Sequence, residues 1–299
     1  MPRVAIVFNP SKFDTLDEVQ RAVERECAEA GWERPEWFET DADDAGAAAA
    51  ERALSTRPDL ICAMGGDGTV RVVGSVMRGS DVPLGLLASG TGNLLARNLD
   101  LPLNDQAAAM RVALTGEDLR MDVATARTDS GTDTDFLVMS GVGLDAAIMV
   151  STDEGLKKRI GWIAYVLGGA KALFQRGCKA RVIADGQPAF THHAKMVLTC
   201  NASSLMGGLE VAHGARLDDG QLDAVLIRPS GLVGWTSVAI SMLRKRTRNH
   251  ALMRQATGER IRVDLARPLP AEVDGDLIGQ TRWVEYTIDP ASLIVRVAS

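Results

Sequence analysis

The feature that most constrains the fold is a buried strand that ends abruptly in glycines and leads into a helix. Leu60–Met64 is a short apolar run, Gly65–Thr69 reads G-G-D-G-T, and a helix is expected over Val70–Met77. The pattern recurs where the apolar run Pro83–Leu87 leads into Ser89–Asn93 and then into another helix. Strands that alternate with helices predict a mostly parallel sheet with helices on both faces.

After about Asp122 the pattern changes to short β-rich runs separated by turns, which predicts an antiparallel sheet. Helices are expected within it over Leu156–Gln175 and Gly231–Arg248. A length of 299 residues suits two domains. We predict an α/β domain at 1–124 with a doubly wound sheet, a β-rich, sandwich-like domain at 125–299, and a cleft between them. Whether the C-terminal residues pack back on the first domain stays open.

Composition and charge exclude several classes of protein. Hydrophobic residues make up 46% and charged residues 24%, as in globular rather than disordered chains. A net charge of −6 argues against nucleic acid as a partner. The four cysteines form no C-x-x-C pair, so a reducing cytoplasm is the expected setting. No signal-peptide pattern is expected at the N-terminus, and no run reaches the ~18 apolar residues that span a bilayer.

Both glycine-rich turns suit the binding of phosphate. Glycines let the backbone approach a phosphate closely, and the helix that follows adds its positive N-terminal end. Ligands of parallel sheets bind at the carboxyl ends of the strands, where both turns lie. Asp67 would repel a phosphate directly, so it is expected to hold Mg²⁺ or to orient a substrate hydroxyl. The chain has no G-x-x-x-x-G-K-[ST] and is therefore not a Walker-type kinase.

At these two turns the chain strongly resembles the diacylglycerol kinase catalytic-domain family, specifically its soluble bacterial lipid kinases. Asn9-Pro10 matches the family's turn after the first strand, and Thr40 matches a threonine that closes on the nucleotide. Three later segments match as well: Gly155–Tyr165, Leu205–Asp223 with its D-D-G, and Ala271–Gly279 with AEVDGDLIG. Together these matches imply an ATP-dependent kinase that phosphorylates the hydroxyl of a lipid, with diacylglycerol as the first expectation.

The resemblance also implies the site residues, with ATP and Mg²⁺ as cofactors. Asp67 would serve the Mg²⁺ of Mg-ATP. Asp276, where the family has the glutamate of D-G-E, would be the catalytic base. A structural Mg²⁺ would be held by Asp219 with the backbone carbonyls of Arg216 and Gln221. The nucleotide would contact Asn9, Pro10, Ser11, Lys12, Phe13, Thr40, Gly65, Gly66, Asp67, Gly68, Thr69, Val70, Arg71, Val72, Gly90, Thr91, Gly92 and Asn93.

Departures from the family pattern leave the substrate open. Asp276 is one methylene shorter than the family's glutamate, and Leu94 replaces the acid of G-T-x-N-D, as in the sphingosine-kinase branch. The alternatives are a kinase for a sphingoid base or phosphatidylglycerol, an NAD kinase, and a non-catalytic relative that binds lipid or nucleotide. The G-T-G-N-L-L-A-R and D-D-G clusters favour a lipid kinase over an NAD kinase.

A lipid substrate requires contact with the membrane surface. The basic run Arg244, Lys245, Arg246 and Arg248 is expected to be a solvated face, with an anionic membrane contact as the alternative. The stripe before it is expected to pack in the core: Leu232, Val233, Trp235, Val238, Ala239 and Met242. The expected location is the cytoplasm with peripheral membrane association, and a homodimer is left open.

Overall fold

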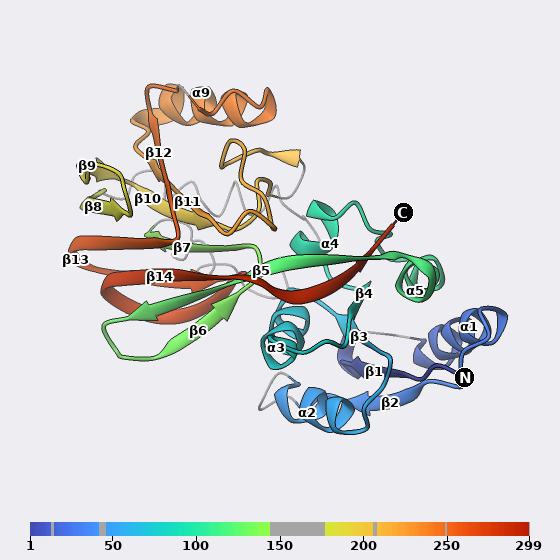
Figure 1. The fold of residues 1–299 in the computed structure, drawn as a ribbon. Coiled ribbons are helices and arrows are strands. Elements are labelled where there is room, and N and C mark those ends of the chain that lie inside the picture. Colours follow the sequence, from blue (N-terminus) through green and yellow to red (C-terminus); the bar gives the residue numbers. More distant parts are fainter. Residues whose placement is uncertain (13–14, 42–45, 144–176, 206–207, 249, 299) are drawn as a thin grey trace. The chain divides into compact units, whose positions relative to one another are not determined.

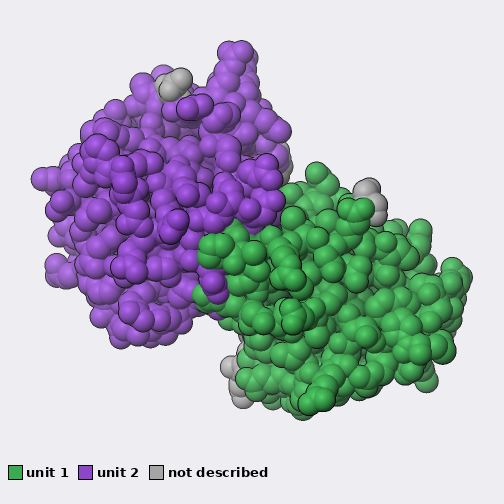
Figure 2. All heavy atoms as spheres, viewed as in Figure 1, with its two compact units in different colours: residues 1–123, 290–299 green, residues 124–289 purple. Residues whose placement is uncertain are grey.

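The structure, a computed structural model, describes residues 1–12, 15–41, 46–143, 177–205, 208–248 and 250–298. Phe13, the predicted helix at 156–175 and the family match at 155–165 lie outside the described residues. The chain forms two compact units (Figure 2). Unit 1 comprises Met1–Val123 and Pro290–Ser299, and unit 2 comprises Ala124–Asp289.

Unit 1 is built on a parallel sheet in the strand order β2-β1-β3-β4, and the end of β14 pairs with β4 (Figure 1). Strands β1, β3 and β4 are buried along their whole length because α1 and α5 cover one face and α2 and α3 the other. The elements are β1 (Val4–Phe8), the 3-10 helix η1 (Pro10–Lys12), α1 (Leu16–Glu29), β2 (Glu36–Glu39), α2 (Ala47–Ser55), β3 (Leu60–Gly65), α3 (Asp67–Met77), β4 (Leu84–Ala88), α4 (Leu94–Asn98) and α5 (Gln106–Thr115).

Unit 2 is an antiparallel sheet in the order β12-β11-β10-β7-β13-β14, in which β8 pairs with β13 and β9, and β5 with β6 (Figure 1). Its core includes Phe136 and Tyr286, whose ring centroids lie 6.0 Å apart, edge to face. The elements are β5 (Glu117–Thr128), β6 (Asp133–Phe136), β7 (Met139–Gly143), β8 (Cys178–Ala184), β9 (Phe190–Ala194), β10 (Met196–Cys200), β11 (Leu222–Ile227), α9 (Gly231–Leu243), β12 (Met253–Gly258), β13 (Arg260–Val273) and β14 (Asp276–Val297).

The predicted fold class, a doubly wound α/β domain followed by a β-rich antiparallel domain, is confirmed. Two predicted element boundaries are wrong. Helix α3 begins at Asp67 rather than Val70, so the first glycine turn is shorter than expected and Asp67 lies in the first helical turn. Helix α9 ends at Leu243 rather than Arg248, because Lys245 adopts the left-handed conformation (φ 53°) that stops a helix.

The predicted core stripe on α9 is wrong for half of its residues. Leu232 and Val233 are 65% and 83% exposed, and Ala239 is exposed as well. Val238 and Met242 are buried as expected, and Trp235 is partly buried. Ile240 and Leu243, on the same helix, are 48% and 61% exposed. Helix α9 therefore presents several large apolar side chains to solvent. Among the described residues, no helix has the length and apolar character needed to cross a membrane.

Candidate functional site

The carboxyl ends of four parallel strands bring the predicted nucleotide residues of unit 1 to one edge of the sheet (Figure 1). Asn9 follows β1, Thr40 follows β2, Gly66 follows β3, and Ser89 follows β4. The N–H of Ser89 donates to the carbonyl of Gly65 at 2.9 Å, so the two glycine turns leave neighbouring strands side by side. This edge is the usual place of ligands in an open parallel sheet.

The carboxylate of Asp67 joins the two glycine turns. Its Oδ2 accepts the N–H of Asn93 at 2.8 Å, and its Oδ1 accepts the N–H of Leu94 at 2.6 Å. These are the first N–H groups of α4, and the first N–H groups of a helix have no acceptor within the helix. Asp67 therefore caps α4 from the neighbouring turn, a role that was not predicted. Leu94 contributes only its backbone N–H to this link, so the loss of the family's acid at that position leaves the link intact.

Asn93 explains why α4 needs an acceptor from elsewhere. The residue is left-handed (φ 50°), and its Oδ1 accepts the N–H of Gly90 at 3.0 Å while its Nδ2 donates to the Gly90 carbonyl at 2.7 Å. Its side chain thus closes the second turn and does not cap the helix. The sequence carried no signal for the role of Asp67, because Asn93 is itself a favoured N-cap residue and only the structure shows its side chain bonded to Gly90 instead.

Two glycines allow the turns to approach each other. A Cβ on Gly92 would lie 2.4 Å from Asp67 Oδ2, and a Cβ on Gly90 would lie 3.0 Å from the Cα of Gly66. Side chains at these positions would separate the turns or displace the carboxylate. The glycines Gly66, Gly68, Gly90 and Gly92 are partly exposed, and the N-terminal end of α3 supplies N–H groups and a positive dipole beside them. The guanidinium of Arg97 donates to the Gly92 carbonyl at 2.7 Å and adds a positive charge beside the second turn.

Asn9 and Thr40 complete the edge. Asn9 Oδ1 accepts the N–H of Ser11 at 3.0 Å and its hydroxyl at 2.7 Å, which fixes the start of η1. The N–H of Thr40 donates to the Phe8 carbonyl at 2.9 Å. Thr40 is only 9% exposed, and a Cβ on Gly46 would lie 2.7 Å from its methyl carbon. Thr40 is therefore buried against Gly46, at the start of α2.

The fit of Asp67 to Mg²⁺ follows from its hydrogen bonds. Each carboxylate oxygen has lone pairs beyond the one that accepts a backbone N–H, so both can still contact a hard cation. In the part of the chain that the structure describes, no three His, Cys, Asp or Glu side chains are grouped to hold a metal. A Mg²⁺ bound mainly by phosphates and water needs only one or two carboxylates.

The D-D-G loop of unit 2 holds the residues predicted for a structural Mg²⁺. Asp219 Oδ1 accepts the N–H of Gln221 at 3.0 Å, and Gly220 between them is left-handed (φ 69°). Asp218 accepts two hydrogen bonds from Arg216 at 2.9 and 3.0 Å, and this contact lowers the pKa of the Asp218 carboxyl. A carboxylate with two backbone carbonyls is an all-oxygen donor set of the kind that Mg²⁺ prefers, so the loop fits that ion.

Asp276 follows a tight turn that buried acids hold in place. Asp274 and Gly275 are both left-handed (φ 45° and 89°) and connect β13 to β14 in a two-residue hairpin. Asp274 is 7% exposed and accepts three backbone N–H groups, from Leu137 at 2.7 Å and from Val138 and Met139 at 3.0 Å.

Glu272 supports the same turn from β13. It is 2% exposed, and its Oε2 accepts the N–H of Gly275 at 2.7 Å. The two buried acids were not predicted, and they present Asp276 as an exposed carboxylate at the first position of β14.

Comparisons with known proteins identify the family. Residues 3–126 match the diacylglycerol kinase catalytic domain, and residues 138–297 match the YegS C-terminal NAD kinase beta sandwich-like domain. A "Probable lipid kinase YegS-like" from Pseudomonas fluorescens is 32% identical over 239 residues, which are 78% of this chain and 76% of that protein. The chain belongs to the family of the diacylglycerol kinases and YegS-like lipid kinases. The resemblance found in the sequence is thus confirmed.

One further relative and two solved structures align with this chain over a greater length. A diacylglycerol kinase from Bacillus subtilis is 27% identical over 283 residues, 93% of this chain and 91% of that protein. The crystal structure of a candidate diacylglycerol kinase from Bacillus anthracis str. Sterne has a TM-score of 0.81 at 20% identity, over 99% of this chain and 97% of that chain. An NAD kinase from Archaeoglobus fulgidus in complex with ATP has a TM-score of 0.54 at 12% identity, over 98% of this chain and 93% of that chain. These two structures share the fold.

Proposed function

We propose that this member of the lipid kinase family transfers the γ-phosphoryl group of ATP to the hydroxyl of a lipid, with diacylglycerol as the acceptor. The observation that carries the proposal is the pair of glycine turns joined by Asp67 at the carboxyl edge of the unit 1 sheet. Such an edge, with open backbone and a helix N-terminus, suits the phosphates of a nucleotide.

The residues of unit 1 have distinct proposed tasks. Residues 65–72 and 90–93 contact the phosphates, and residues 9–13 with Thr40 contact the rest of the nucleotide. Asp67 holds the second turn in place and serves the Mg²⁺ that accompanies ATP. When bound, that ion neutralises the charge that develops on the phosphate oxygens. In unit 2, Asp219 with the carbonyls of Arg216 and Gln221 holds a structural Mg²⁺, and Asp276 takes the proton of the lipid hydroxyl.

A panel of acceptors tests the proposed substrate. The protein is incubated with radiolabelled ATP and, in turn, with diacylglycerol, a sphingoid base, phosphatidylglycerol and NAD. We expect label to appear in phosphatidic acid at a rate well above that of any other product. Labelled NADP would favour an NAD kinase, whose fold this chain shares. A higher rate with another lipid would replace diacylglycerol, and no labelled product with any acceptor would favour a non-catalytic relative.

Helix α9 is the proposed contact with the membrane. Its exposed apolar residues Leu232, Val233, Ile240 and Leu243 are followed directly by Arg244, Lys245 and Arg246. Apolar side chains next to cations suit the surface of an anionic bilayer. With four free, buried cysteines, this arrangement supports a cytoplasmic protein that associates peripherally with the membrane.

Vesicle sedimentation tests this contact. Because a basic residue near an anionic surface contributes about 1 kcal/mol, the double variant Arg244→Gln/Lys245→Gln is expected to bind phosphatidylglycerol vesicles at least about tenfold more weakly. Arg282→Gln removes a charge from β14 and serves as the control, with unchanged binding expected. Equal binding of the wild type to neutral phosphatidylcholine vesicles, or of the double variant to anionic ones, would contradict the contact.

A further inference from the structure

Unit 2 contains a hollow of about 730 Å³ whose lining is strongly basic. Three arginines line it, Arg228, Arg248 and Arg254, together with His192, His213 and His250. None of the described residues that line it is an aspartate or a glutamate. We name it the arginine hollow. In a chain whose net charge is −6, three guanidinium groups around one concave surface are a local reversal of charge.

The partners of these arginines are neutral. The guanidinium of Arg254 lies 4.4 Å from the ring centroid of Phe190, and its Nη1 lies 3.2 Å from His192 Nε2. Arg228 Nη2 donates to the Ala251 carbonyl at 2.9 Å. Within the described ranges, no carboxylate forms an ion pair with Arg228, Arg248 or Arg254. Neutral partners fix the side chains and leave their positive charge uncompensated.

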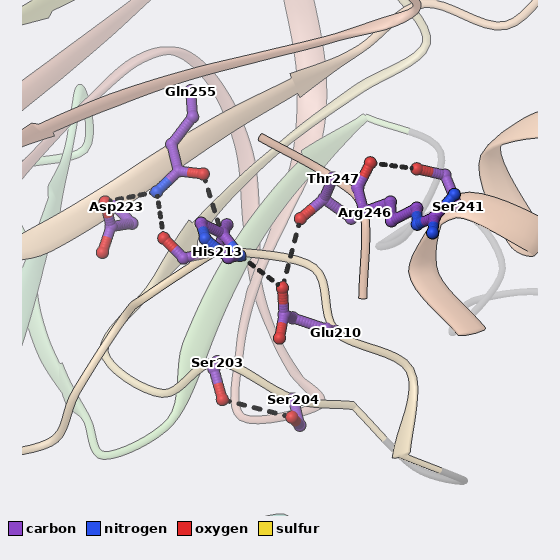
Figure 3. A network of polar contacts seen from close by, with 9 residues as sticks. All are labelled: Ser203, Ser204, Glu210, His213, Asp223, Ser241, Arg246, Thr247 and Gln255. Carbon is purple, nitrogen blue, oxygen red and sulfur yellow. Dashed lines mark hydrogen bonds and ion pairs between the residues drawn. The ribbon is translucent and has the colours of Figure 1, made fainter. Parts of the chain in front are cut away.

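A network of hydrogen bonds joins two lining residues, His213 and Gln255, to two acids that do not line the hollow, Asp223 and Glu210 (Figure 3). Gln255 Nε2 donates to Asp223 Oδ1 at 2.8 Å and to the His213 carbonyl at 3.0 Å, and the N–H of His213 donates to Gln255 Oε1 at 3.1 Å. His213 Nδ1 also lies 2.9 Å from Glu210 Oε1. Since Glu210 offsets any charge on His213, the three arginines account for the positive charge of the hollow.

The pKa of His192 reflects the positive charge of the arginine hollow. Burial lowers the pKa of the His192 imidazole, and the charges of Arg228 and Arg254 lower it further. Two arginines from different segments, one after β11 and one on β12, therefore act on the same ring. An anion placed between them would be attracted by both.

We propose that the arginine hollow binds a phosphate-bearing ligand. Guanidinium groups match phosphate oxygens with two parallel hydrogen bonds, which makes arginine the preferred partner of phosphate. A volume of about 730 Å³ lies in the range of small-molecule sites and leaves room beside one phosphate for an organic group or a second phosphate. All lining residues belong to unit 2, whereas the proposed ATP phosphates bind to unit 1.

The histidines provide a local measurement of binding. All four lie in unit 2, and three of them line the hollow, while His193 points to the opposite side of β9 from His192. Inorganic pyrophosphate is titrated into the full chain while the imidazole signals are followed by NMR. We expect the signals of His192, His213 and His250 to shift together, with a much smaller change at His193.

Charge-removing variants connect the shifts to the arginines. Since a charge-assisted hydrogen bond contributes about 1.5–3 kcal/mol, Arg228→Gln and Arg254→Gln should each weaken pyrophosphate binding about tenfold or more. Arg248→Gln, whose side chain has no hydrogen-bond partner among the described residues, should weaken it without affecting the melting temperature. Arg282→Gln is the matched control and should bind as the wild type does. Unchanged affinity in all three hollow variants would overturn the proposal.

The source of the phosphate is resolved with short-chain lipids. Dihexanoyl phosphatidic acid and pyrophosphate are compared with dihexanoylglycerol, which lacks the phosphate. Tighter binding of the phosphatidic acid supports a lipid headgroup, and equal or tighter binding of pyrophosphate supports a soluble phosphate compound. Binding of dihexanoylglycerol equal to that of the phosphatidic acid, or no histidine shift with either phosphate at millimolar concentration, would overturn the proposal.

Discussion

Asp67→Asn is expected to lower kcat by about 10²-fold or more, because small displacements of a positioned group cost that much. Asparagine offers one acceptor oxygen where the carboxylate offers two, and its amide N–H₂ would face the N–H of Asn93 or Leu94. The second glycine turn then loses an anchor, and Mg²⁺ loses a ligand. Steady-state kinetics with the true acceptor measures the loss, and a melting curve checks that the protein still folds.

Two further variants distinguish the position of the Asp67 carboxylate from its charge. Asp59→Asn removes a carboxylate just before β3, the strand that leads to Asp67. This carboxylate also accepts a backbone N–H, that of Arg3 at 2.7 Å. This variant is the matched control, and near-normal kcat is expected. Gly92→Ala keeps the charge of Asp67 but places a Cβ 2.4 Å from Oδ2, so it should also reduce activity. Asp67→Asn with kcat within a few-fold of wild type would remove Asp67 from the mechanism.

Asp276→Asn is expected to lower kcat by ~10²–10⁴-fold, the usual contribution of a general base. The KM for ATP should barely change, because the proposed nucleotide residues all lie in unit 1 and Asp276 lies in unit 2. Asp276 is exposed, so the variant should change the free energy of unfolding by no more than about 0.5 kcal/mol. Kinetics with saturating ATP and the identified lipid, together with the melting temperature, test all three expectations.

Asp276→Glu is the companion variant, since it restores the acid of the family. We expect it to retain activity, and to exceed the wild type if the shorter aspartate works through a water molecule. Asp274 and Glu272 are unsuitable as controls, because they hold the turn through backbone N–H groups and their loss would disturb the fold. If Asp276→Asn keeps a near-normal kcat, the assignment of the base is wrong and Asp67 becomes the leading candidate.

The order of elements in unit 1 was predictable because its strands are continuous apolar runs that end in glycine turns. Leu60–Gly65 and Leu84–Ala88 are buried along their whole length, so periodicity and turn residues located them to within one or two positions. Parallel strands then bring their carboxyl ends to one edge, which predicted the gathering of the two turns. The first turn of α3 was missed, since glycine in a helix is disfavoured by propensity and the sequence at 66–69 does not indicate that the helix has already begun.

The sequence by itself determined the fold class, the family and the two glycine turns, because apolar runs and glycines act locally on the backbone. Only the tertiary structure decided what the side chains contact across distant segments. The carboxylate of Asp67 caps a helix that begins 27 positions later, and Asp274 accepts N–H groups more than a hundred residues away. The exposure of Leu232 and the clustering of Arg228 with Arg254 were decided in the same way. Burial and charge clustering depend on which surfaces meet after folding, and spacing along the chain does not encode that directly.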